Sequence, residues 1–136
     1  MASLEPGARI ANRFVLERRI GNGGHAQIWT ATDESDGARV ALKCLHPDSC
    51  SPQQAWAVLL HESRMAGRLD HPGVLRTGAP QQDGELVFLP LEYTGGTDLQ
   101  RLRGASYLRI VPVLIEVAGI LEHAHQRAIA HRDLKP

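Results

Sequence analysis

The sequence lacks an excess of charge of either sign, because fifteen Lys and Arg residues balance fifteen Asp and Glu residues. Without a global positive field, nothing steers the chain onto nucleic acid or an anionic membrane. It also lacks any uninterrupted apolar run of membrane-spanning length. The first twelve residues carry Glu5, Pro6, Gly7 and Arg9 and no apolar stretch, so we expect neither a signal peptide nor an anchor. Partners are therefore expected to be recognised locally, and no membrane segment is predicted.

Cysteine is scarce as well. The two cysteines, Cys44 and Cys50, have a spacing that matches no metal-binding or redox motif. We expect both to be structural thiols that stay reduced in a cytoplasmic setting. The chain has 136 residues, of which 43% are hydrophobic and 22% charged, and this composition predicts one soluble globular domain able to bury a core.

Three of the thirteen glycines fall in one short stretch. Residues 14–20 mix apolar and charged side chains at strand spacing and run directly into Gly21-Asn22-Gly23-Gly24-His25-Ala26. Glycines of this kind bring backbone N–H groups close to phosphates in several folds, so this signal alone is weak. In a dinucleotide-binding fold a helix begins at this point, but residues 27–32 are β-branched and alternating, which predicts a second strand. A hairpin lying over phosphates therefore fits better.

A lysine follows on the next predicted strand, residues 39–45, after a turn at 33–37. Ala41 and Lys43 point to one face, which leaves room for a flat ligand; a solvated strand lysine is the simpler alternative. The next helix favours the functional interpretation. Ser51, Pro52 and Gln54 form a helix start with a capping box, and Glu62 falls in the apolar stripe of that helix. Because an unpaired carboxylate facing a core is costly, we expect Glu62 to pair with Lys43.

The remaining pattern predicts an α+β fold. Residues 74–77 are expected to form a fourth strand, 81–84 a turn and 85–91 a fifth strand whose end lies at an edge because of Pro90. This gives a five-stranded antiparallel sheet with one helix. A short helical stretch at 98–103 and an amphipathic helix over 106–127 follow, and Pro112 should either start or kink the second helix. Ala128 stands at the helix end, where a left-handed conformation would cost roughly 1 kcal/mol.

The last six residues are His131-Arg132-Asp133-Leu134-Lys135-Pro136. An aspartate with a lysine two residues later offers a carboxylate to accept a hydroxyl proton and an ammonium to hold a phosphate. Together with the earlier motifs, this stretch resembles the catalytic loop of the protein kinases, in the bacterial serine/threonine form. The resemblance covers residues from about 14 to 136. It implies an N-terminal segment at 1–12, a kinase N-lobe and hinge at 13–94, and the beginning of a helical C-lobe at 95–136, incomplete at the catalytic loop.

The resemblance also implies roles for individual residues. Asp133 would be the catalytic base and Lys135 the contact to the γ-phosphate, while Lys43 and Glu62 form the lysine–glutamate pair. The hinge would be formed by Glu92 and by Thr94, which present backbone groups to the adenine edge. Asp98 is a weaker candidate for a ribose contact, with a simple helix cap as the alternative. The full set of residues expected to bind the cofactor is Ile20, Gly21, Asn22, Gly23, Gly24, His25, Ala26, Ile28, Ala41, Lys43, Leu91, Glu92, Thr94 and Asp98.

The implied cofactor is ATP, with Mg²⁺ in a complete family domain, and the implied partner is a protein carrying Ser or Thr hydroxyls. The asparagine that follows the catalytic aspartate by five residues in this family, and the later metal-binding aspartate, would lie beyond Pro136. No metal ligand is therefore assigned, and we expect the 136-residue chain to be inactive alone. Two alternatives stay open: a non-catalytic nucleotide-binding or interaction module, and a small-molecule phosphotransferase of related fold, which the Arg132 and Lys135 pattern disfavours.

Overall fold

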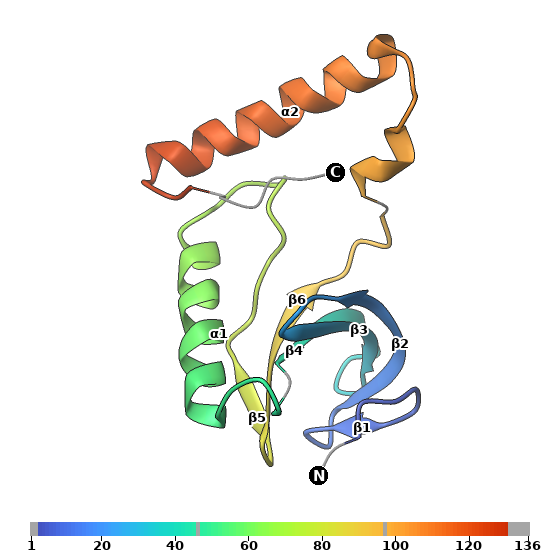
Figure 1. Cartoon of the computed structure of the whole chain (residues 1–136), viewed down its shortest axis with the longest axis vertical. Helices are drawn as coiled ribbons and strands as arrows, with labels where there is room; N and C mark the ends of the chain where they lie inside the picture. Colours follow the sequence, from blue (N-terminus) through green and yellow to red (C-terminus); the bar gives the residue numbers. More distant parts are fainter. Residues whose placement is uncertain (1–2, 46, 97, 131–136) are drawn as a thin grey trace. The chain divides into compact units, whose positions relative to one another are not determined.

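The computed structural model describes residues 3–45, 47–96 and 98–130. The chain divides into two compact units (Figure 1). The sheet unit comprises Met1–Gly67 and Leu75–Tyr93, and the helical unit comprises Arg68–Val74 and Thr94–Pro136.

The sheet unit is built on one antiparallel sheet whose strands lie in the order β1-β2-β3-β4-β6-β5. Their bounds are β1 Arg9–Ile10, β2 Phe14–Asn22, β3 Ala26–Asp33, β4 Arg39–Leu45, β5 Gln81–Asp83 and β6 Leu86–Glu92. The β4 bounds agree with the sequence-based expectation, and β2, β3 and β6 differ from it by one or two residues at their ends. Strand β2 contains two register irregularities against β3, at Leu16/Arg18 and Arg19/Gly21.

Two features of the predicted five-stranded sheet are wrong. Residues 74–77 form no strand and contribute only a single bridge between Thr77 and Leu91, next to a backbone hydrogen bond from Glu92 N to Arg76 O at 2.8 Å. The segment expected to be a turn is instead β5, Gln81–Asp83, which pairs with Leu86, Val87 and Phe88. A two-residue strand, β1, was not anticipated either. Pro90 lies beyond the end of β5, where its carbonyl accepts a hydrogen bond from Gly78 N at 2.8 Å.

The core lies on both faces of the sheet. On one face, the side chains of Phe14, Leu42 and Phe88 are 0–1% exposed, and the Phe14 and Phe88 rings meet edge to face with centroids 5.7 Å apart. On the other face, Leu45, Val87 and Leu89 pack against helix α1, Pro52–Gly67, through Ala55 and Leu59. Alternation along β4 therefore sends Leu42 and Cys44 to the first face and Lys43 and Leu45 to the second, helix-covered face.

Helix α1 begins at Pro52, as expected, and the capping box is present. Ser51 N donates to Gln54 Oε1 at 3.0 Å, and Gln54 N donates to Ser51 Oγ at 3.2 Å. The expected apolar stripe is only partly buried, because Val58 is 55% exposed and the helix ends at Gly67, before Leu69. Ala55 and Leu59 alone in this helix are buried, so a narrow stripe one helical turn long fixes α1 on the sheet.

An ion pair ties the β1–β2 turn to the end of β3. Arg13 donates to both carboxylate oxygens of Asp33, at 2.8 and 2.6 Å, and Ser35 donates to Asp33 through its amide at 3.0 Å and its hydroxyl at 2.7 Å. The hydrogen bond from Arg13 holds the pKa of Asp33 well below its usual range, with the Ser35 donors acting in the same direction and burial opposing both. A buried carboxylate is thus fully compensated.

The helical unit contains a short 3₁₀ helix, η1, Leu99–Leu102, and the long helix α2, Tyr107–Gln126. Helix α2 continues through Pro112 and therefore does not begin there, which settles one of the two expected possibilities. The apolar side chains of α2 are mostly half-buried or exposed, and Ala124 is its one buried residue. Ala128, just after the helix, has φ 58°, the left-handed conformation anticipated from the sequence. No helix among the described residues is long and apolar enough to cross a membrane.

Candidate functional site

The expected lysine–glutamate pair is present in the sheet unit. Lys43 Nζ lies 2.9 Å from Glu62 Oε2 and 3.2 Å from Glu62 Oε1, so strand β4 and helix α1 are joined by a bidentate ion pair. The side chains are 28% and 38% exposed, respectively. Glu62 therefore does not face a closed core as its place in the stripe suggested, and water reaches both partners. An ammonium group has three N–H donors, so Lys43 keeps a donor that the two carboxylate oxygens do not require.

The surroundings of Lys43 follow from strand register. Ile28 on β3 and Leu89 on β6 lie directly opposite Lys43 and share its face of the sheet. The neighbouring row on this face contains Ala41 and Leu91, which are also directly opposite each other. Ala41 is a small, buried residue, as expected for a position that must leave space beside Lys43. Leu89 was not among the expected residues, although the alternation of Val87, Leu89 and Leu91 would have placed it beside Lys43.

The glycine-rich stretch forms the turn between β2 and β3. Gly23 N donates to Ala26 O at 2.9 Å, which closes the turn and leaves Gly24 and His25 at its exposed tip. Gly21 lies opposite Ile28, and a Cβ built at Gly21 would touch the Ile28 side chain at 3.4 Å. A Cβ at Gly24 would meet nothing within 4 Å. Ile20, next to a register irregularity, is 44% exposed. The turn therefore presents open space lined by backbone.

The end of β6 holds the expected hinge residues of the sheet unit. Glu92 N donates to Arg76 O at 2.8 Å, and Glu92 Oε2 accepts from Arg76 N at 2.9 Å. Next to it, the guanidinium of Arg39 lies over the Tyr93 ring, 5.8 Å from its centroid. Arg39 also pairs with Glu17, Nε to Oε2 at 3.0 Å. Arg39 was not expected to matter, although its parity with Ala41 and Lys43 places it on their face.

Thr94 and Asp98 belong to the helical unit and are exposed. Asp98 is the N-cap of η1, and its carboxylate accepts from Gln100 N at 3.0 Å. The cap that the sequence left as an alternative is therefore formed, and the carboxylate already has one partner. The motif His131-Arg132-Asp133-Leu134-Lys135-Pro136 lies outside the described residues, so the roles expected for Asp133 and Lys135 stay predictions.

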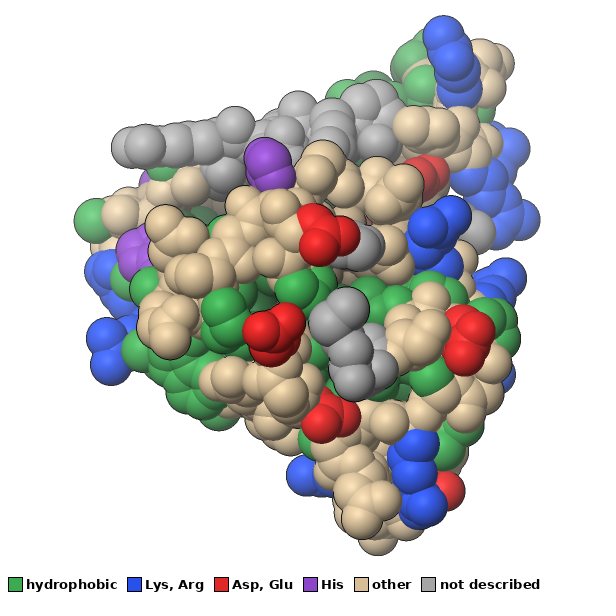
Figure 2. All heavy atoms as spheres, turned by 60° about the horizontal axis from the view of Figure 1, so that its bottom comes forward, with side chains coloured by type: hydrophobic (Ala, Val, Ile, Leu, Met, Phe, Trp, Pro, Cys, Tyr) green, Lys and Arg blue, Asp and Glu red, His purple; other side chains and the backbone are tan. Residues whose placement is uncertain are grey.

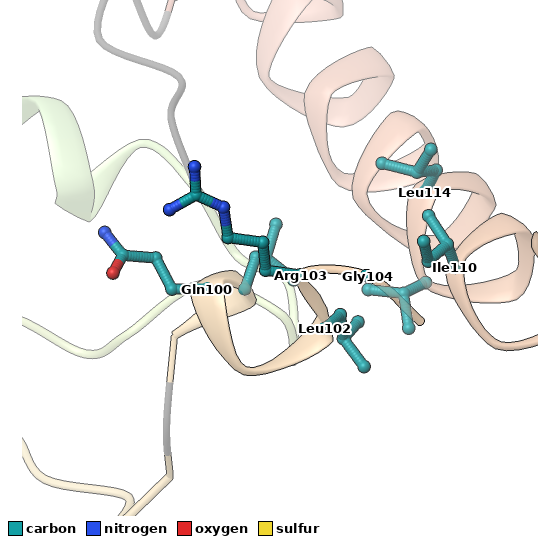
Figure 3. A pocket seen from close by; sticks show the side chains of 8 residues that line it. Gln100, Leu102, Arg103, Gly104, Ile110 and Leu114 are labelled. Atoms are coloured by element: carbon teal, nitrogen blue, oxygen red, sulfur yellow. The ribbon is translucent and has the colours of Figure 1, made fainter. Parts of the chain in front are cut away.

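A pocket of about 500 Å³ lies elsewhere, in the helical unit. Figure 3 shows its two walls, with Leu102 on η1 and with Ile110 and Leu114 on α2. Gln100 and Arg103 also line it, but none of the site residues expected from the sequence does. This pocket shares no lining residue with the candidate site, and its lining suits apolar side chains rather than phosphates.

The charged side chains and the buried thiol among the described residues indicate no second functional site. On the face drawn in Figure 2, the acidic side chains lie apart from one another and form no acidic patch. Cys44 is fully buried, and burial raises the pKa of its thiol to about 12, so it is a structural thiol as expected. In the part of the chain that the structure covers, no group of three or more His, Cys, Asp or Glu side chains could hold a metal ion.

Comparison with known proteins gives the family. The model of the protein kinase domain matches residues 14–136, nearly the whole chain. The chain belongs to the protein kinase family. Among curated kinases, PknA of Mycobacterium tuberculosis is 32% identical over 96% of this chain and 32% of its own length. PrkC of Bacillus subtilis is 28% identical over 96% of this chain and 21% of its own. PknD of Chlamydia trachomatis is 29% identical over 91% of this chain and 15% of its own. All three are named as serine/threonine-protein kinases.

Solved kinase structures show the same fold. The kinase domain of M. tuberculosis PknI superposes with a TM-score of 0.74 at 24% identity, covering 98% of this chain and 55% of that one. The apo form of PpkA-294 gives a TM-score of 0.80 at 22% identity, covering 99% and 56%. This kinase chain therefore has a partial kinase-like fold, a β-sheet lobe with one helix followed by a further helix. It spans between about a seventh and a third of the curated relatives' length.

Proposed function

We propose that this chain provides the ATP-binding lobe, hinge and first C-lobe helix of a serine/threonine protein kinase. In this proposal residues 13–94 form the nucleotide-binding lobe with its hinge, residues 95–136 begin the C-lobe, and residues 1–12 precede the domain. The reaction is transfer of the γ-phosphoryl group of ATP to a Ser or Thr hydroxyl of a partner protein. Named relatives of the bacterial serine/threonine type support the substrate class.

The observation that carries the proposal is the Lys43–Glu62 pair at 2.9 Å. The pair links the β4 strand to α1, the two elements that hold the phosphate-binding lysine and its glutamate in kinases. A solvated strand lysine would need no bidentate carboxylate from a helix nineteen residues away. Glu62 fixes the direction of a long, flexible side chain, which lowers the entropic cost of presenting its remaining donor to a phosphate.

The residues around this pair fit a nucleoside triphosphate. Gly24 and His25 form no backbone hydrogen bond with any described residue, so their amides can donate to phosphate oxygens. The open space at Gly24 would accept a ligand that a side chain there would obstruct. Ala41 and Leu91 offer a small and an apolar surface for a base, and we propose backbone contacts to its edge from Glu92 and Thr94. When bound, ATP supplies the phosphoryl group that is transferred.

We propose that Asp133 accepts the hydroxyl proton of the protein substrate and that Lys135 contacts the γ-phosphate. Both roles rest on the match of the final motif to the kinase catalytic loop. Among the described residues no group of three or more His, Cys, Asp or Glu side chains could hold a metal ion, and we propose no Mg²⁺ ligand among them. The nucleotide would be bound through its phosphates by the glycine turn and Lys43, with Ile20, Gly21 and Ile28 beside it.

A chemical test is unusually clear in this chain, because its only two lysines are Lys43 and Lys135. An ATP derivative with a reactive acyl group on its γ-phosphate transfers that acyl group to a nearby lysine amine, and peptide mapping locates it. We expect acylation of Lys43, suppressed by excess ATP and abolished by Lys43→Arg. Because Lys135 is proposed to contact the same γ-phosphate, it should be acylated as well, and Lys135→Arg should remove only this second label. Glu62→Gln should lower the rate of Lys43 acylation without moving the label elsewhere.

Labelling that excess ATP does not suppress, or that persists at equal rate with an acyl phosphate lacking the nucleoside, would contradict nucleotide binding. Transfer is tested separately by incubating the chain with ATP, Mg²⁺ and a basic protein rich in Ser and Thr. Phosphorylation that Asp133→Asn abolishes would support catalysis by the chain itself. Competed labelling of Lys43 without any phosphorylation would favour the non-catalytic nucleotide-binding module.

A further inference from the structure

Two histidines meet inside the helical unit, away from the candidate site. His71, in the segment Arg68–Val74, and His123, near the end of α2, have ring centroids 5.0 Å apart with planes tilted by 58°. Gly73 in the same segment packs so closely on α2 that a Cβ there would lie 2.4 Å from Ile120 Cδ1. The segment and the helix are therefore in intimate contact at these rings.

The hydrogen bonds specify the neutral form of both rings. Gly73 N donates to His71 Nδ1 at 2.9 Å, so that nitrogen must carry a lone pair. His123 Nδ1 lies 3.2 Å from Arg127 Nη1, and since a guanidinium can only donate, His123 Nδ1 must also accept. The proton of neutral His123 is then on Nε2, which is buried and has no hydrogen-bond partner among the described residues. A proton added to either Nδ1 would face an N–H donor and break its bond.

We propose that the His71–His123 contact is a pH-sensitive fastening between the segment Arg68–Val74 and the end of α2. It is closed when the His123 ring is neutral and is released when that ring takes up a proton. The fastening joins the segment that directly follows α1, which carries Glu62, to the helix that precedes the catalytic-loop motif. Acidification would thus loosen a connection between two parts of the kinase chain without touching the nucleotide-binding residues.

The surroundings of His123 mainly favour its neutral form. Desolvation lowers its pKa first, followed by the positive charge of Arg127 and by His71, whereas Asp70 raises it. Arg68 adds a second tie, since its Nη2 donates to Arg127 O at 2.5 Å. Because the folded pKa lies below that of a free histidine, about 6.5, the unfolded or opened form binds more protons below that pH. The closed form is then fully stable above about pH 6.5 and loses stability as the pH falls toward the folded pKa.

Proton NMR of the full chain tests the proposal. At pH 7.5 we expect nuclear Overhauser contacts between the His71 and His123 rings and slow exchange of the Gly73 amide. As the pH falls below about 6.5, the ring contacts should weaken and the protection of Gly73, corrected for intrinsic exchange, should drop by up to about tenfold per pH unit. His125, exposed two residues further along α2, provides the matched control, and His125→Asn should keep the whole response.

The double variant His71→Asn/His123→Asn carries side-chain oxygens that can accept hydrogen bonds but do not titrate in this range. It should keep Gly73 protected at pH 5.5 and show no pH dependence. Ring contacts and Gly73 protection that persist in the wild-type chain at pH 5.5 would overturn the proposal, as would absence of the ring contacts at pH 7.5. If the double variant does not fold, the wild-type titration alone decides, because release must follow the histidine titration curves.

Discussion

The sheet unit and the helical unit bury their apolar residues to very different extents. In the sheet unit Phe14, Leu42 and Phe88 are almost inaccessible, because the sheet is covered on both faces by its own chain. In the helical unit Tyr107, Leu108 and Ile115 of α2 are 73%, 71% and 67% exposed, and no described residue covers them. The sheet unit thus contains the contacts that stabilise it, whereas α2 has an apolar side that resembles a surface made for burial. Nucleotide recognition is accordingly expected to persist when α2 is perturbed.

The largest expected effect is a loss of unfolding free energy in the buried core of the sheet unit. Phe88→Ala removes one ring of the edge-to-face pair from a fully buried position and should lower the free energy of unfolding by about 3–5 kcal/mol. Leu114→Ala, at 52% exposure in α2, should cost less than about 0.5 kcal/mol. Both tryptophans, Trp29 and Trp56, lie in the sheet unit, so fluorescence during denaturant unfolding reports on that unit. Equal losses for the two variants would remove the contrast.

The next effect concerns the buried carboxylate of the sheet unit. Asp33→Asn removes the charge that Arg13 and Ser35 stabilise and should cost about 1–3 kcal/mol at neutral pH. Because the folded pKa of Asp33 is depressed, its contribution is complete above the unfolded value of about 3.8 and is lost as the pH falls through the folded pKa. Unfolding midpoints measured from pH 5 down to pH 2 should therefore fall more steeply for the wild type than for the variant. Parallel curves would show that the ion pair contributes no net stability.

A smaller change in stability is expected in the helical unit, at the end of α2. Ala128 has φ 58°, which is strained for a residue with a Cβ, so Ala128→Gly should stabilise the end of α2 by about 1 kcal/mol. Amide exchange of Arg127 and Ile129, whose N–H groups bond to Ala124 O, should slow by about fivefold, while exchange in β3 and β4 stays the same. Gly119→Ala, inside the helix and with open space for a Cβ, is a control for glycine content. Faster exchange in Ala128→Gly would mean that the left-handed conformation is not populated.

The effect on stability is also expected to be small at the candidate site itself. Lys43→Met breaks an ion pair whose partners are 28% and 38% exposed, so we expect a loss of no more than about 1 kcal/mol rather than the larger penalty of a buried pair. Nucleotide-dependent labelling should nevertheless vanish. A thermal shift assay separates these effects, because ATP should raise the midpoint of the wild type and not that of the variant. Strong destabilisation without ATP would show that Lys43 is chiefly structural.

Local signals in the sequence predicted the parts of the site that depend on short-range chemistry. The capping box predicted the start of α1 correctly. The position of Glu62 on that helix predicted its pairing with Lys43, which the structure shows. The exposure of the pair was not predictable, since periodicity gives a direction and not the depth of burial. Strand β5 was missed because Gln81, Gln82 and Asp83 are polar and precede Gly84, so they form a strand only by pairing with β6. The Arg39–Tyr93 contact likewise depends on which strands are neighbours.

The sheet ends in two very short strands. On one side the outermost strand is β1, with two residues, and on the other it is β5, with three. Exposed strand edges are templates on which foreign strands add, and long, flat edges lead to fibrils. Here each outer strand offers too few free backbone groups to align an incoming peptide. Growth by strand addition to the native sheet is therefore disfavoured, and the concentration at which this lobe stays in solution should be limited by side-chain contacts instead.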